Sequence, residues 1–180
     1  MKILKNELKS ELNIRTEKNF PKDGIEFIDI MPLIIQKETF NEIIEKFAQE
    51  IKDKQVDYIV GPEARGLIIG AAVANKLEIG FIPVRKAGKL PPTTVETKFE
   101  YEKEYGKDIL ELPKLINNES YKDKNFYIID DIYATGNTAR AIKEAVESLG
   151  GNIVGTGVVI NIKELNDDNV FSIIDINEEQ

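Results

Sequence analysis

The segment from Asp130 to Thr138 joins two adjacent carboxylates to a small, hydroxyl-rich turn. A short apolar run, Phe126 to Ile129, precedes the acids, and apolar residues at helical spacing resume from Ala139 to Leu149. This pattern predicts a buried strand that ends at the acids, then a turn and a helix. Such a turn presents backbone N–H groups and the positive end of a helix dipole, which together bind phosphate. The acids would lie beside it at the carboxyl end of a strand, where open α/β sheets bind ligands.

Asp130 and Asp131 are expected to bind hydroxyl groups, or a metal-bound sugar, because like charges keep them from the phosphate itself. A phosphate beside a diol indicates a ribose phosphate. A simpler explanation is a plain strand end, with Thr135 or Thr138 capping the helix. The agreement of strand, turn and helix favours a ligand site.

A second strand-to-helix turn is predicted at Gly61 to Gly66, between a strand over Val56–Gly61 and a helix over Ala64–Leu77. A helix start attracts anions, and the guanidinium of Arg65 can fork onto phosphate oxygens. The alternative is an ordinary helix start, with Glu63 beside the dipole and Arg65 in solvent.

Three cations, Arg85, Lys86 and Lys89, lie within five residues after a strand predicted over Ile79–Val84. A solvated basic loop is one explanation. Because the chain carries a net charge of −8, a local cluster of cations favours an anionic ligand. The same negative charge argues against nucleic acid as the main partner.

The composition excludes several kinds of chemistry, because the chain contains no Cys and no His. Disulfides, thiol nucleophiles, the usual zinc sites and imidazole catalysis are ruled out. No run of apolar residues predicts a membrane span. Residues 1–12 mix Lys and Glu with leucines at helical spacing, which indicates a surface helix and not a signal peptide. We therefore expect a cytoplasmic protein with no membrane partner.

The remaining segments predict alternating strands and helices in one domain over residues 1–180. A helix over Phe40–Ile51 is expected to begin at a capping box formed by Thr39 and Glu42. Further strands are expected at residues 108–112, 152–162 and 170–176. This order predicts an α/β fold, with a mostly parallel sheet flanked by helices. Residues 86–106 show no clear periodicity and predict a long loop that serves as an active-site lid.

The stretch from Asp130 to Thr138 resembles the ribose-phosphate signature of the type I phosphoribosyltransferases. The resemblance implies that Asp130 and Asp131 hold the ribose 2- and 3-hydroxyls of phosphoribosyl pyrophosphate. Tyr133 stands where an aliphatic residue is usual in that family, and Asn137 stands where glycine is common. The turn that would wrap the 5-phosphate consists of Ala134, Thr135, Gly136, Asn137 and Thr138.

The other two turns resemble the pyrophosphate-binding parts of the same family. Its adenine-specific members have an acidic-Ala-Arg-Gly loop like Glu63-Ala64-Arg65-Gly66, which implies that Glu63, Ala64 and Arg65 bind pyrophosphate. By the same resemblance Arg85, Lys86 and Lys89 neutralise that group. Glu104, Tyr105 and Gly106 resemble the tail of the family's mobile loop, here about residues 86–106. Its glutamate contacts or protonates the purine N7, which implies a catalytic role for Glu104, with Glu102 as the reserve candidate.

The segment Phe20–Ile30 resembles the base-binding hood of the family, about residues 1–35 here. Phe27 would stack on the purine, and backbone groups near Ile25 and Phe27 would read its edge. Glu26 stands at a usually aliphatic position, and Ile28 replaces a usual arginine. From the residues alone, a surface turn with two hydrophobic residues facing the core is the favoured explanation, and the base-binding role is what the resemblance implies.

The resemblance implies an adenine phosphoribosyltransferase, which makes AMP and pyrophosphate from adenine and phosphoribosyl pyrophosphate. It implies Mg²⁺ as cofactor, held mainly by substrate and water with no direct protein ligand, and a homodimer. Two alternatives stay open at this point: a phosphoribosyltransferase for another purine base, and a non-catalytic nucleotide sensor of the same fold.

Overall fold

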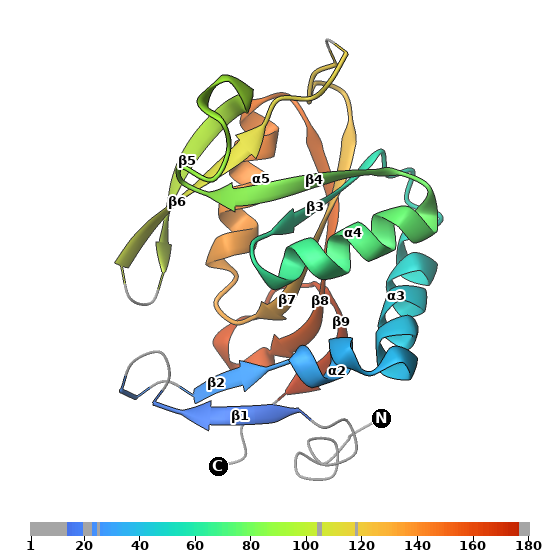
Figure 1. Ribbon diagram of the computed structural model, residues 1–180, viewed down its shortest axis with the longest axis vertical. Helices are drawn as coiled ribbons and strands as arrows, with labels where there is room; N and C mark the ends of the chain where they lie inside the picture. Colours follow the sequence, from blue (N-terminus) through green and yellow to red (C-terminus); the bar gives the residue numbers. More distant parts are fainter. Residues whose placement is uncertain (1–13, 20–22, 25, 104–105, 118, 177–180) are drawn as a thin grey trace.

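A computed structural model describes residues 14–19, 23–24, 26–103, 106–117 and 119–176 of the chain (Figure 1). The helix expected over residues 1–12, together with Ile25 and Glu104, lies outside the described residues. The strands are β1 (Arg15–Lys18), β2 (Glu26–Asp29), β3 (Tyr58–Pro62), β4 (Gly80–Lys86), β5 (Val95–Lys103), β6 (Gly106–Pro113), β7 (Asn125–Tyr133), β8 (Asn152–Ile162) and β9 (Phe171–Ile176). The helices are α2 (Met31–Ile35), α3 (Lys37–Ile51), α4 (Arg65–Leu77) and α5 (Asn137–Ser148), with short 3₁₀ turns η1 (Pro92–Thr94) and η2 (Lys163–Leu165).

Seven strands form one sheet in the order β5-β6-β4-β3-β7-β8-β9. Strands β4, β3, β7, β8 and β9 run parallel, and β6 and β5 add an antiparallel pair at one edge. Helices α3 and α4 cover one face of the sheet, and α5 covers the other (Figure 1). The α/β fold with a mostly parallel sheet is therefore confirmed. No helix within the described ranges is long and apolar enough to cross a membrane.

Successive residues of β7 enter two different cores. Phe126 and Ile128 pack with α5, whereas Tyr127 and Ile129 pack with α3 and α4. Because side chains alternate along a strand, Asp130 and Asp131 continue this pattern onto opposite faces. The acids were expected to end the strand, but β7 continues through both of them to Tyr133, with Asp130 paired to Val158 and Tyr133 to Asn161.

Much of the expected lid is a hairpin. Strands β5 and β6 pair antiparallel from Lys103↔Gly106 back to Val95↔Pro113, so the prediction of a structureless loop over residues 86–106 is wrong. Phe99 and Tyr101 pack on the core beside α5, while charged residues alternate with them. This two-residue alternation is the strand signal that the charged composition obscured.

The capping box at Thr39 is also wrong. Helix α3 begins at Lys37, and no side chain caps its first turn. The Thr39 hydroxyl instead donates to the Leu33 carbonyl at 2.6 Å, which ties α3 to α2. Helix α2 and the antiparallel β1–β2 hairpin are elements that the sequence patterns did not predict. The hairpin lies beyond the carboxyl ends of β7 and β8, at the lower end of the molecule in Figure 1.

Candidate active site

Three neighbouring parallel strands, β3, β4 and β7, end at the same edge of the sheet, and each leads into one of the predicted turns. The first link between them is Glu63. Its Oε2 accepts a hydrogen bond from Arg85 Nε at 2.7 Å and another from the Lys86 N–H at 3.0 Å. Burial opposes ionisation of Glu63, but these two donors outweigh it and lower the pKa of the carboxyl below its usual value. Glu63 therefore orients Arg85, and its side chain is a poor partner for pyrophosphate.

The second link is Arg65, the first residue of α4. Its Nε lies 2.6 Å from Asp131 Oδ2, in a pair whose side chains are 26% and 10% exposed. The guanidinium carbon also lies 5.0 Å from the centre of the Phe27 ring, a cation–π distance. Arg65 thus contacts both Phe27, which is expected to stack on the base, and Asp131, which is expected to hold the ribose.

Gly66 permits this approach of α4 to β7. A Cβ atom at Gly66 would lie 2.7 Å from the Pro62 ring, 3.0 Å from the Ile129 carbonyl oxygen and 3.1 Å from Asp130 Oδ1. Any side chain would push the start of α4 away from the strand. The glycine therefore keeps Arg65 within reach of Asp131.

Asp130 lies on the other face of β7, where its Oδ1 accepts a hydrogen bond from the Asp131 N–H at 2.8 Å. Burial and the adjacent negative charge of Asp131 raise the pKa of Asp130 well above its usual value, while Arg65 acts in the opposite direction. Perturbed acids of this kind are common at functional sites, where charge is held ready for a ligand.

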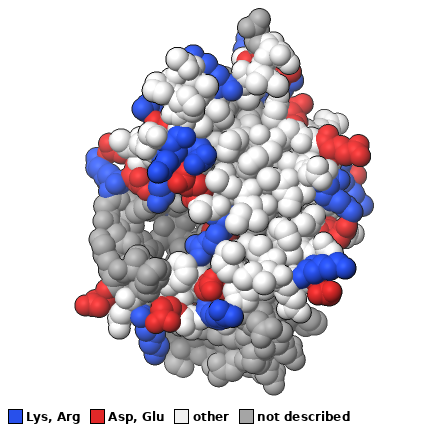
Figure 2. Space-filling model, in the orientation of Figure 1, with Lys and Arg blue, Asp and Glu red and all other residues white. Residues whose placement is uncertain are grey.

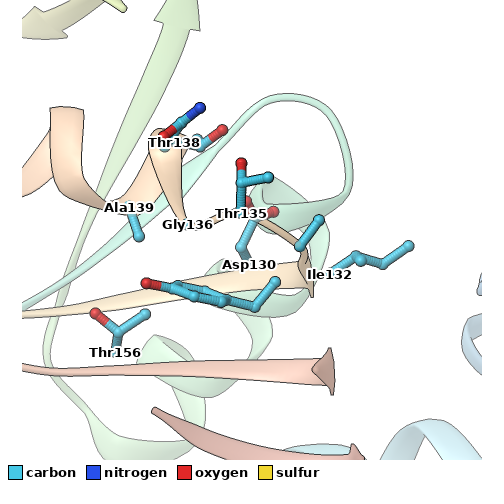
Figure 3. A pocket seen from close by; sticks show the side chains of 10 residues that line it. Asp130, Ile132, Thr135, Gly136, Thr138, Ala139 and Thr156 are labelled. Carbon is cyan, nitrogen blue, oxygen red and sulfur yellow. The ribbon is translucent and has the colours of Figure 1, made fainter. Parts of the chain in front are cut away.

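A cavity of about 240 Å³ adjoins Asp130 at the carboxyl end of β7 (Figure 3). Figure 3 shows Thr135 and Thr138 on one side of Asp130, and Thr156 of β8 on another. The predicted turn forms much of the wall, whose lining residues are Asp130, Ile132, Tyr133, Ala134, Thr135, Gly136, Asn137, Thr138, Ala139 and Thr156. The structure thus brings Asp130, one of the two acids expected to hold the ribose, and all five residues of the expected 5-phosphate turn to a single cavity.

The turn itself has the features of an anion site. Gly136 is the N-cap of α5 with φ +78°, and a Cβ there would lie 2.3 Å from the Tyr133 hydroxyl. No threonine side chain caps the helix. Within the described chain, the first amide of this helix to donate to a carbonyl is that of Arg140, which bonds Gly136 O at 3.0 Å. The amides of residues 135–139 therefore remain available to an anion.

Side chains that the sequence analysis missed hold the outer side of this turn. Asn166 Nδ2 donates to Ala134 O at 2.8 Å, and Arg140 Nη2 donates to Thr135 O. Tyr133 and Arg140 both donate to Asp168 Oδ2, each at 2.8 Å. Burial and the Asp168 contact raise the pKa of Tyr133 to about 12. Asn166 and Asp168 lie in a polar segment about thirty residues from the turn, and no local pattern connects them to it.

The basic turn after β4 is held by a buried acid. Lys89 N donates to Lys86 O at 3.1 Å, and Leu90 N lies 3.4 Å from Glu111 Oε2. Glu111 of β6 is 1% exposed and forms an ion pair with Lys98 of β5 at 2.7 Å. The Lys98 contact and the backbone N–H of Gly88 lower the pKa of Glu111, although burial opposes them. Glu111 therefore joins the hairpin to the turn that carries Lys86 and Lys89.

Not every candidate residue is brought into this arrangement. Lys89 is exposed, and no described contact joins its side chain to Arg65, Asp130 or Asp131. Ile25 and Glu104 lie outside the described residues, and the side chain of Glu102 is not described either. Two groups of contacting side chains lie around the ends of β3, β4 and β7. One group is Arg65 with Asp131 and Phe27, and the other is Glu63 with Arg85.

A mostly parallel sheet, with two acids near the end of one strand, a phosphate-type turn after it and an arginine at the start of a neighbouring helix, is typical of nucleotide-handling proteins. The comparison with protein families agrees, because a family model described as "Phosphoribosyl transferase domain" matches residues 34–180. The fold is that of the type I phosphoribosyltransferases. Among curated proteins, adenine phosphoribosyltransferase from Clostridium acetobutylicum is 47% identical over 154 residues, which cover 86% of this chain and 87% of that protein.

Solved structures give the same result. Adenine phosphoribosyltransferase from Thermoanaerobacter pseudethanolicus superposes with a TM-score of 0.81 at 38% identity, over 93% of this chain and 99% of the other. The enzyme from Saccharomyces cerevisiae, solved with an imino-altritol bisphosphate and adenine, gives 0.78 at 36% identity, over 92% and 97%. The chain belongs to the adenine phosphoribosyltransferase family.

Proposed function

We propose that this protein transfers the phosphoribosyl group of phosphoribosyl pyrophosphate to adenine and releases AMP and pyrophosphate. The observation that carries the proposal is the contact of Arg65 with both Asp131 and Phe27. Arg65 is proposed to bind the leaving group, Phe27 the base and Asp131 the ribose, and this contact brings the three side chains together. The relatives named above, one of them solved with adenine, support the choice of base.

The reaction in this proposal needs no nucleophile from the protein. Adenine attacks C1 of the ribose as pyrophosphate leaves, and positive charge develops on the sugar, as in other glycosyl transfers. Asp130 and Asp131 hold the ribose hydroxyls and place negative charge near that centre. Arg65 and Arg85 stabilise the departing pyrophosphate, and Glu63 keeps Arg85 at that edge of the sheet. A chain without Cys or His suits such chemistry.

Mg²⁺ is the cofactor that we propose. Hard oxygen donors suit this ion, and Asp130 and Asp131 are carboxylates at the rim of the site. Since the two acids point to opposite faces of β7, the protein offers Mg²⁺ few direct ligands, and the substrate oxygens and water would complete its shell. When bound, the ion neutralises pyrophosphate charge.

The base site and the proton chemistry of the proposal rest on the sequence resemblance. Phe27 stacks on adenine, backbone groups near Ile25 and Phe27 read its edge, and Glu104 supplies a proton or hydrogen bond to the purine. Closure of hairpin β5–β6 over the site would exclude water from it.

A homodimer is the proposed assembly. Uncharged side chains cover the middle of the face shown in Figure 2, over α4 and β4. Ile68 of α4 is 40% exposed, whereas large apolar side chains are more often buried. A mass measurement in solution tests the assembly, with Ile68→Glu expected to give a monomer. Cytoplasmic localisation stays a prediction from the sequence.

The decisive experiment is a turnover assay with phosphoribosyl pyrophosphate, Mg²⁺ and each purine base in turn. AMP formation with adenine as the preferred base is the expected result. Preference for hypoxanthine, guanine or xanthine would mean that the substrate is another purine base. The residues Glu26 and Ile28, which depart from the family's base-binding hood, would then account for the changed specificity. Nucleotide binding without turnover of any base would indicate a sensor and overturn the proposal.

A further inference from the structure

The outer side of the turn between β7 and α5 is held by side chains that do not belong to it. Asn166 Nδ2 donates to the carbonyl oxygen of Ala134 at 2.8 Å, and Arg140 Nη2 donates to that of Thr135. Neither Arg140 nor Asn166 is among the described residues that line the cavity. Both side chains contact the turn through its carbonyl oxygens.

Holding these two carbonyl groups also fixes two amide groups. A trans peptide unit is planar, and its N–H points opposite to its C=O. The peptide units that contain Ala134 O and Thr135 O also contain the N–H groups of Thr135 and Gly136. When the carbonyls point toward Asn166 and Arg140, those N–H groups point away from these two side chains, neither of which is among the residues that line the cavity in Figure 3.

The side chains of Arg140 and Asn166 are themselves held in place by further hydrogen bonds. Arg140 donates to Asp168 Oδ2 at 2.8 Å and to Asn137 Oδ1 at 2.9 Å, and Tyr133 donates to the same Asp168 oxygen. Arg140 is therefore held by two groups besides the carbonyl that it orients, and one of them, Asp168, is itself held by the buried Tyr133.

Asn166 is fixed in a similar way from β8. Its Nδ2 lies 3.0 Å from the side-chain oxygen of Asn161 and 3.0 Å from the carbonyl of Ile162. Asn161 is fully buried. Asn166 thus connects the turn to a rigid part of the core, at the end of the strand next to β7.

We propose that Arg140 and Asn166 are positioning residues for the 5-phosphate of the ligand. They set the amides of Thr135 and Gly136 before the ligand arrives, so that little ordering is needed on binding. This role rests on the proposed function, because that function places a ribose 5-phosphate against the turn. The charge of Arg140 is compensated by Asp168, so its effect is on geometry and not on long-range attraction.

The test compares four variants by calorimetric binding of AMP, ribose 5-phosphate and pyrophosphate. Arg140→Met removes the guanidinium but keeps the stem, and Asn166→Leu removes the amide donors. Arg140→Lys keeps the charge without the planar fork. Lys143→Met, on the same helix, removes one positive charge from a residue that lies 3.9 Å from Glu147 Oε1.

Arg140→Met is expected to lower the affinity for AMP and for ribose 5-phosphate by about ten- to a hundredfold. Asn166→Leu is expected to lower both affinities by about two- to tenfold. Arg140→Lys should resemble Arg140→Met, because lysine cannot hold Thr135, Asn137 and Asp168 together. Pyrophosphate affinity should stay unchanged in all four, as should every affinity of Lys143→Met. With ribose 5-phosphate bound, amide exchange at Thr135 and Gly136 should become faster in Arg140→Met and Asn166→Leu than in wild type.

Three results would overturn the proposal. These are unchanged ribose 5-phosphate affinity in both Arg140→Met and Asn166→Leu, wild-type behaviour of Arg140→Lys, and equal losses for pyrophosphate and ribose 5-phosphate. A wild-type protein that binds ribose 5-phosphate but turns over no base would refute the proposed function alone, since the variants still report on the turn. A wild-type protein that does not bind ribose 5-phosphate would refute both.

Discussion

Arg65 Nε lies 2.6 Å from Asp131 Oδ2, and the same guanidinium lies 5.0 Å from the centre of the Phe27 ring. These residues come from the start of α4, the end of β7 and strand β2. One cation therefore couples the parts of the site that would hold the leaving group, the ribose and the base. A ligand with a pyrophosphate group competes with Asp131 for this cation.

Arg65→Met should therefore lower kcat/KM for adenine and phosphoribosyl pyrophosphate by about ten- to a hundredfold, because a charge-assisted contact to the leaving group is lost. Pyrophosphate affinity should fall as well. AMP affinity should change less, since AMP has no pyrophosphate. Steady-state kinetics and calorimetry check both expectations, with Lys76→Met of the same helix as the control. An equal loss of AMP and pyrophosphate affinity would indicate a general structural defect instead.

The ribose acids lead to a second prediction. Asp130→Asn and Asp131→Asn should each raise the KM for phosphoribosyl pyrophosphate by about ten- to a hundredfold, because a charged acceptor for a hydroxyl is lost while the shape is kept. Asp123→Asn is the matched control, since Asp123 is exposed and lies in a turn with φ +60° that asparagine tolerates. Wild-type kinetics in the double Asn variant would refute the ribose assignment.

The raised pKa of Asp130 predicts an effect on stability. Between the unfolded and the folded pKa of this carboxyl, the folded protein binds more protons than the unfolded chain, so stability falls as pH rises through that window. Asp130→Asn removes this loss. The variant should melt higher than wild type at pH 8, by about 2–4 °C for each kcal/mol recovered, and not at pH 4. A lower melting temperature at pH 8 would contradict the prediction, which thermal denaturation at the two pH values tests.

Glu111 leads to the opposite pH dependence. Its folded-state pKa is lowered chiefly by Lys98 and the Gly88 amide, so the carboxylate stabilises the fold above its usual pKa of 4.5 and loses that contribution as pH falls through the folded value. Below about pH 4.5, wild type should lose stability more steeply than Glu111→Gln, in urea melts across a pH series. Glu100→Gln, on the exposed side of the same hairpin, should keep the wild-type slope.

The last prediction concerns Glu104 and its reserve candidate, Glu102. Glu104→Gln should lower kcat more than it raises the KM for adenine, because a contact made in the transition state shows in kcat. General acid–base help is worth about 10²–10⁴ in rate. Steady-state kinetics of Glu104→Gln and Glu102→Gln separate the two candidates. Wild-type rates in both variants would mean that the hairpin only shields the site.

The sequence by itself determined the strands and helices around the site and the residues of its turns. Short apolar runs bounded by polar turns predicted β3, β4, β7 and β8, and the helix periodicity predicted α3, α4 and α5. The segment from Asp130 to Thr138 was identifiable because a phosphate turn requires small residues at a helix start, which is a local requirement. Patterns that depend only on neighbouring residues can be recognised in the sequence.

The tertiary structure decided which residues meet. The contact of Arg65 with Phe27 and Asp131, and the grip of Asn166 and Arg140 on the turn, join segments whose order in the chain says nothing about their distance. Strand β6 was expected at residues 108–112, but strand β5 was missed for a related reason. The charged residues of β5 become compatible with a strand only at the edge of the sheet, where one face meets α5 and the other meets solvent. Long-range packing determines both the contacts between these distant residues and the formation of strand β5. The reason is that the free energy of such contacts depends on which surfaces the folded chain buries together.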